Sequence, residues 1–133
     1  MKLKIAATIL ILVTGSHAYA NCKVRDAVGF WHMTTNESGF VSYCTMLIRS
    51  DGTLNTAKSS CEAIGVFGEK FSFLFNSGNV KVKSTCEITI NLENEFGGST
   101  TISHGQMSRN GEQMIGMGDN EGNPLTFNGV KFN

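Results

Sequence analysis

The sequence predicts an all-β fold, a single small antiparallel up-and-down β-barrel of about eight strands stapled by disulfides. Three observations predict it. Turn-forming groups recur at intervals of about ten residues, short runs of alternating apolar and polar residues lie between them, and four cysteines occur in a short chain. Helical periodicity is nearly absent, and the only window that could form a short helical turn is 59–65. A closed barrel is favoured over a two-sheet sandwich because closure leaves no unpaired strand edge.

The predicted turns are rich in Gly, Asn and Asp, which tolerate the positive φ angles of tight hairpins. They are expected at 36–39, 50–52, 76–79, 97–98, 110–111 and 120–123. The strands between them are expected at 27–34, 40–49, 53–58, 69–76, 79–93, 99–108, 112–119 and 124–132.

The most regular alternation covers residues 80–92. Every second residue there is apolar or small, and the residues between are charged or polar. This period of two predicts one long strand with a core-facing side, on which Cys86 lies. Phe71, Phe73 and Phe75 alternate in the same way on the preceding strand and predict a matching aromatic face.

The first twenty residues have the three parts of a secretory signal peptide. Lys2 and Lys4 form a basic head, an apolar stretch covers 5–13, and a tail of small and polar residues ends in Ala-Tyr-Ala at 18–20. The apolar stretch is about half the roughly 20 residues that a membrane-spanning helix needs. We therefore expect export rather than membrane anchoring.

Cleavage is expected between Ala20 and Asn21. The chain then divides into a signal peptide at 1–20 and a single β-barrel domain at 21–133, located in the periplasm or secreted. Removal of the signal leaves 9 basic and 11 acidic residues, a formal charge of −2. No basic run or stripe remains, so binding to nucleic acid is not expected.

Four cysteines in a short exported chain predict two disulfides with three possible connectivities. If the second hairpin turns at 50–53, Cys44 lies opposite Ser59, and Cys61 is two residues farther along with the same facing. A Cys44–Cys61 bridge then needs a small bulge or a shift of register. The hairpin geometry favours this pair but leaves open the pairings in which Cys44 joins Cys22 or Cys86.

No residue pattern predicts catalysis. His32 and His104 lie on the first and sixth predicted strands, and no nucleophile, metalloprotease or cofactor motif is present. We therefore expect a non-catalytic protein without a bound metal or cofactor.

An apolar cavity inside the barrel would be lined by aromatic and thioether side chains. Phe71, Phe73 and Phe75 are expected there, together with Met107 and Met114. Methionines more often fill irregular gaps in a core, so core filling is the favoured role for Met107 and Met114. The phenylalanines are likewise mostly expected in the core, and the sequence leaves open whether Phe71, Phe73 and Phe75 fill the barrel or line a cavity.

Two stretches carry a resemblance to known families. The sequence Gly29-Phe30-Trp31 is similar to the G-x-W element that opens lipocalins and related calycin barrels. The stretch from 43 to 62, with its two cysteines, resembles the bridged hairpin of small secreted bacterial inhibitors of serralysin-type metalloproteases, which are also calycin-like barrels.

The lipocalin resemblance implies that Trp31 closes one barrel end by packing under the first strand and that Gly29 is structural. The inhibitor resemblance implies a Cys44–Cys61 bridge, which by elimination leaves Cys22 to join Cys86. In the inhibitor family an N-terminal tail enters the protease cleft.

The sequence as a whole predicts an exported, lipocalin-like binding protein for a small apolar ligand or a secreted protein partner. The alternative is an inhibitor of a secreted hydrolase, similar to the metalloprotease inhibitors.

Overall fold

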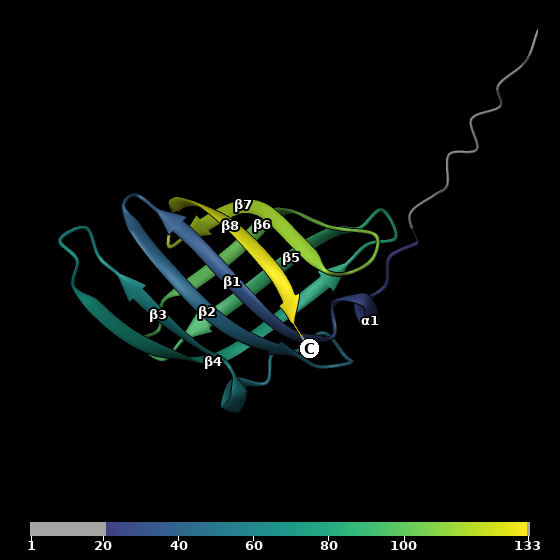
Figure 1. The fold of residues 1–133 in the computed structure, drawn as a ribbon, viewed down its shortest axis with the longest axis horizontal. Helices are drawn as coiled ribbons and strands as arrows, with labels where there is room; N and C mark the ends of the chain where they lie inside the picture. Colours follow the sequence, from purple (N-terminus) through teal and green to yellow (C-terminus); the bar gives the residue numbers. More distant parts are fainter. Residues whose placement is uncertain (1–20, 133) are drawn as a thin grey trace, which may run out of the picture.

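A computed structural model describes residues 21–132, which form one closed antiparallel barrel (Figure 1). Eight strands follow one another around the barrel in chain order, and β1 pairs with β8 to close it. The predicted all-β, eight-stranded antiparallel barrel with two disulfides is thereby confirmed. The predicted signal peptide and its cleavage site fall on residues 1–20 and lie outside the described residues, apart from Asn21.

The strands are β1 (Gly29–Glu37), β2 (Phe40–Ile48), β3 (Ser60–Ile64), β4 (Lys70–Val82), β5 (Glu87–Asn94), β6 (Ser99–Met107), β7 (Gln113–Asn120) and β8 (Asn123–Phe132). Two short helices accompany them, α1 (Val24–Ala27) and the 3-10 helix η1 (Thr56–Lys58). Within the described part of the chain, no helix is long and apolar enough to span a bilayer.

The two ends of the barrel differ. At one end the hairpins β1–β2, β3–β4, β5–β6 and β7–β8 turn around, and we call this the open end. At the other end α1 lies beside the start of β1 and the end of β8 (Figure 1), and we call this the closed end. The N-terminal segment is tied there by the Cys22–Cys86 disulfide.

Inward-facing side chains change from apolar to polar along the barrel axis. On β1 the inward positions begin with Trp31 and Met33, which are 0% and 4% exposed, and continue with the half-buried Thr35 and Glu37. Successive residues of a strand point to opposite faces, so these four side chains share the interior. On β1 the close-packed core therefore occupies the closed half of the barrel, and polar side chains face the interior near the open end.

Trp31 is the centre of the closed end. Its indole Nε1 donates a 2.8 Å hydrogen bond to the carbonyl of Ala27, the last residue of α1. Lys131 lies opposite Trp31 on β8 and covers its ring at the closed end, with Nζ 5.2 Å from the ring centroid and 2.6 Å from the carbonyl oxygen of Asp26. Partial burial in this position lowers the pKa of Lys131, which the charges of Asp26 and Glu112 partly oppose. Trp31 and Lys131 thus hold α1 onto the barrel.

The strand predicted at 79–93 is two strands, and this prediction is wrong. Residues 80–82 end β4, the chain turns at 83–86, and β5 starts at Glu87. Cys86 takes a positive φ of 66° in this turn and is buried, as predicted, whereas Ser84, expected to face inward, is exposed. The turn contains no Gly, Asn or Pro. Even-numbered residues face the core both before and after the turn, so the apolar–polar alternation continued across it and gave no sign of a chain reversal.

The turn predicted at 76–79 lies inside β4. The register of β4 against β5 shifts between Phe75 and Ser77, which marks a β-bulge. Before the bulge the odd-numbered phenylalanines face inward, and after it the even-numbered Val80 does. The Asn-Ser-Gly-Asn sequence therefore bends a strand instead of reversing the chain.

The third strand also differs from its prediction. Residues 53–58, expected as a strand, contain η1, and β3 covers Ser60–Ile64, where the sequence predicted no strand and could have formed a short helical turn. The side chain of Ser59 fixes this arrangement, because its Oγ donates to the Asn55 carbonyl at 2.8 Å and accepts from the Leu47 amide at 3.0 Å. The extra turn of η1 shifts the register, so Cys44 lies directly opposite Cys61.

Both disulfides have the pairing that the sequence favoured. Cys44 is bonded to Cys61 between β2 and β3, with a Cα–Cα distance of 4.0 Å. Cys22 is bonded to Cys86, with a Cα–Cα distance of 5.0 Å and a sequence separation of 64. The first bridge lies in the wall of the barrel and the second ties the N-terminal segment to the turn between β4 and β5.

Candidate functional site

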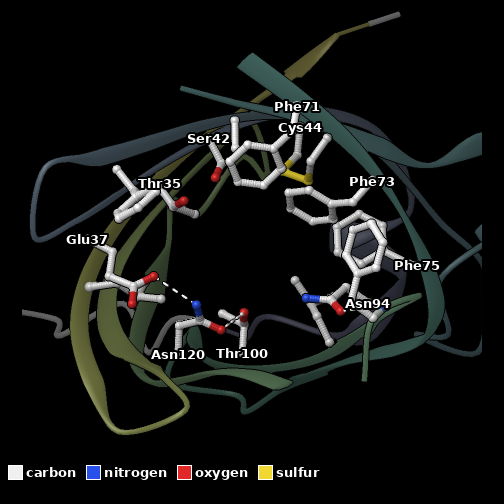
Figure 2. Close-up of a pocket in the computed structure, with 16 residues that line it drawn as sticks. Thr35, Glu37, Ser42, Cys44, Phe71, Phe73, Phe75, Asn94, Thr100 and Asn120 are labelled. Carbon is white, nitrogen blue, oxygen red and sulfur yellow. Dashed lines mark hydrogen bonds between the residues drawn. A yellow bond between two sulfur atoms is a disulfide. The ribbon is translucent and has the colours of Figure 1, made fainter. Parts of the chain in front are cut away.

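A cavity of about 250 Å³ lies inside the open end of the barrel (Figure 2). Its walls are the inward positions of the strands near the four hairpins of that end. The lining residues are Thr35, Glu37, Phe40, Ser42, Cys44, Cys61, Ala63, Phe71, Phe73, Phe75, Leu92, Asn94, Phe96, Thr100, Asn120 and Leu125. The volume lies between the roughly 150 Å³ of a cavity that holds benzene and the roughly 300 Å³ at which pockets for drug-sized ligands begin.

One side of the cavity is aromatic. Phe71, Phe73 and Phe75 follow one another along the inward face of β4 and are progressively more buried, from 43% exposed at Phe71 to 6% at Phe75. The ring centroids of Phe71 and Phe73 are 6.3 Å apart, and those of Phe73 and Phe75 are 5.8 Å apart with the rings nearly perpendicular. These are the separations that aromatic pairs prefer, so the three rings form an ordered apolar wall from mouth to floor.

The neighbouring wall is formed by β2 and β3. The Cys44–Cys61 disulfide lies beside the phenylalanines (Figure 2), and Ala63 follows on the inward face of β3. Ala63 is buried and small, so it leaves room that a larger side chain would fill. The disulfide and this alanine therefore help to create the cavity.

The opposite side of the cavity is polar. Figure 2 shows Glu37, Asn120 and Thr100 joined in a chain of hydrogen bonds across the ends of β1, β7 and β6. Asn120 Nδ2 donates to Glu37 Oε2 at 2.8 Å, and Thr100 Oγ1 donates to Asn120 Oδ1 at 3.1 Å. Both ends of the Asn120 amide are thus occupied, and the Glu37 carboxylate is held facing the cavity.

Three further polar side chains line the cavity, and one of them, Asn94, lies beside Phe75 on the aromatic side. Thr35 and Ser42 present their hydroxyls to the cavity in Figure 2. Asn94 supports the mouth, because its Oδ1 accepts hydrogen bonds from the amides of Phe96 and Gly98 in the β5–β6 turn. The cavity therefore has an aromatic half and a polar half.

The structure separates the five residues that the sequence assigned to an apolar pocket. Phe71, Phe73 and Phe75 line the cavity. Met107 and Met114 do not, because they face each other on β6 and β7 in the closed half and are 1% and 0% exposed. The two methionines fill the core, which was the favoured role for these flexible side chains.

Sequence reasoning missed the polar half. Glu37 was assigned to a turn at 36–39, but β1 extends to Glu37 and the reversal uses only Ser38 and Gly39, whose φ angles are 44° and 92°. The signal was present, because Glu37 has the same parity as Trp31 and so shares its inward face. Asn120 was likewise placed at the start of a turn, although it has the inward parity of Met114 on β7.

The two histidines within residues 21–132 lie apart from the cavity. His32 is on the outer face of β1 and stacks on Phe132, with ring centroids 3.9 Å apart. His104 is exposed on β6. Among residues 21–132, no three His, Cys, Asp or Glu side chains gather as metal ligands would.

Comparison with known proteins identifies the fold. No family model matches the chain, and no curated protein matches it. A de novo designed fluorescence-activating β-barrel matches with a TM-score of 0.56 and 14% identity, over 84% of this chain and 99% of the designed one. A redesigned β-barrel matches with a TM-score of 0.57 and 14% identity, over 84% of this chain and 96% of the other.

These comparisons give no support to the resemblance to lipocalins or to serralysin-type inhibitors, since both solved structures are designed barrels. The chain is similar to small eight-stranded antiparallel β-barrels, and the fold is what this similarity shows.

Proposed function

We propose that this protein is an exported, non-catalytic binding protein whose open barrel end takes a small apolar ligand. The observation that carries the proposal is the cavity of about 250 Å³, walled on one side by Phe71, Phe73 and Phe75. An apolar-walled cavity with a few polar groups is the usual form of a small-molecule site. Its volume suits a ligand of one or two fused rings.

The rest of the molecule supports this function. The closed end is packed around Trp31 and bridged by Cys22–Cys86, which gives the cavity a rigid floor. Disulfides persist in oxidising compartments, and the signal-like N-terminus points the same way, so we place the protein in the periplasm or outside the cell. One structure with the same fold is described as fluorescence-activating, which is compatible with a small-molecule site in a barrel of this size.

The alternative, inhibition of a secreted hydrolase, is less favoured by the geometry. It requires a segment before the barrel that is free to enter a protease cleft. Cys22 is bonded to Cys86, and its backbone amide donates to the carbonyl of Ser84 at 3.2 Å. The segment directly before β1 is thus held against the closed end.

The proposal is tested by calorimetric titration with 1-naphthylmethanol, a neutral two-ring probe. We expect saturable binding of one molecule per chain. Replacing Ala63 with leucine (A63L) should weaken binding by roughly tenfold or more, because overpacking an interior site costs about 1–3 kcal/mol.

The matched control is Ala57→Leu, which adds the same side chain at an exposed position of η1. It should bind the probe as the wild type does. Absence of saturable binding, or equal affinities of the two variants, would contradict the proposed site.

A further inference from the structure

The polar half of the cavity has a single ionisable group. Of the sixteen described residues that line the cavity, only Glu37 carries a side chain that can be charged, because Cys44 and Cys61 are joined in a disulfide. Lys70, near the same end, lies with Nζ 3.8 Å from the carboxylate of Glu62, and both side chains are more than half exposed. No described cation therefore lines the cavity to neutralise Glu37.

In the hydrogen-bonded chain of Thr100, Asn120 and Glu37, each donor and acceptor is defined. Thr100 donates to the carbonyl oxygen of Asn120, so the Asn120 amide group donates to Glu37 Oε2. A carboxylate can accept through both oxygens, and the described residues supply one donor for the pair. Glu37 can therefore accept further hydrogen bonds from a ligand in the cavity, and it offers that ligand a negative charge.

The apolar side of the cavity strengthens the attraction between the Glu37 carboxylate and a positively charged ligand. Phe71, Phe73 and Leu92 give the other side of the cavity an apolar lining, and the attraction between charges rises as the surrounding dielectric falls. A hydrogen bond to a charged group contributes more than one between neutral groups. A bound carboxylate would instead meet a like charge with no cation beside it.

We infer that the ligand is a small arylalkyl amine, bound with its ring against the Phe71–Phe73–Phe75 wall and its ammonium group on Glu37. This inference rests on the proposed function and narrows its ligand from a small apolar molecule to one that joins an apolar ring to a cationic group. Thr35 and Ser42, whose hydroxyls face the same space, are placed to accept further N–H bonds from the ammonium group.

Three probes with one ring system test the inference: 1-naphthylmethylamine, 1-naphthylmethanol and 1-naphthoate. Calorimetric titration of the wild type should give the amine roughly tenfold tighter binding than the alcohol, and the carboxylate the weakest binding. This order tests the inference without any variant.

The Glu37→Gln variant removes the charge and keeps an oxygen that can accept from Asn120. The ratio of the amine's affinity to the alcohol's should fall roughly tenfold in this variant. Glu121→Gln is the matched control, because Glu121 is exposed in the β7–β8 turn at the same barrel end. The substitution changes the net charge by the same amount as Glu37→Gln. Its ratio should equal that of the wild type.

The outcomes separate the inference from the function on which it rests. If the alcohol binds but the amine is no tighter, or if the two glutamine variants behave alike, the inference is overturned and the proposed function stands. If none of the three probes binds saturably, the proposed function fails and the inference fails with it.

Discussion

Trp31→Ala is expected to destabilise the barrel by about 3–5 kcal/mol, the usual range for truncating a fully buried large aromatic residue. The side chain is 0% exposed, and its removal leaves a cavity against Met33, Met114 and Gly129 at the closed end. It also leaves the Ala27 carbonyl without its hydrogen bond from the indole. Both effects weaken the attachment of α1 to the barrel.

Unfolding in urea, followed by far-UV circular dichroism, measures this loss. Fluorescence is unsuitable because Trp31 is the only tryptophan. Trp31→Phe should be intermediate, since it keeps an aromatic ring but loses the Nε1 donor. His32→Ala changes the adjacent, outward-facing residue and should alter stability far less. An alanine variant at position 31 as stable as the wild type would show that the closed end does not depend on this residue.

Removal of the Cys22–Cys86 disulfide is expected to lower the free energy of unfolding by about 4 kcal/mol, and removal of Cys44–Cys61 by about 3 kcal/mol. The difference arises because the first bridge closes a loop of 64 residues and the second a loop of 17, and a longer loop restricts the unfolded chain more. Chemical unfolding of the C22A/C86A and C44A/C61A double variants tests the order. A larger loss of unfolding free energy in C44A/C61A than in C22A/C86A would contradict this account.

The backbone at Cys86 refines this prediction. Its φ of 66° is strained for alanine but not for glycine. The C22A/C86G variant should therefore be more stable than C22A/C86A by about 1 kcal/mol. Equal stabilities would mean that the turn at 83–86 relaxes once the bridge is gone.

The barrel itself was predictable because its signals are local and repeated. Most strands and turns follow from alternation and from Gly and Asn at reversal points, as at Ser38-Gly39 and 120–123. The pairing of Cys44 with Cys61 followed from the hairpin and the resemblance. The errors at 53–64 and 76–86 arose where tertiary contacts outweigh local signals, as in the Ser59 hydrogen bonds and the β4 bulge.

The candidate site was only half predictable for a related reason. Phenylalanines on one strand face predict an inward apolar face at Phe71, Phe73 and Phe75, but the sequence left open whether they fill the core or line a cavity, and the structure places them at the cavity. Glu37 and Asn120 are 83 residues apart in sequence and meet only because the barrel closes. No local pattern could pair them, and the structure is needed to show that Glu37 is the only ionisable side chain among the described residues that line the cavity.

The central claim is that the open end of the barrel, and not its outer surface, holds the ligand. The most direct test is to titrate 15N-labelled protein with 1-naphthylmethanol and follow the amide chemical shifts. We predict saturable changes at Thr35, Ala63 and Phe73, which line the cavity, with little change at Met107 and Met114 in the closed half. Changes confined to outward-facing residues such as His104 and Met117, or none that saturate, would contradict the account.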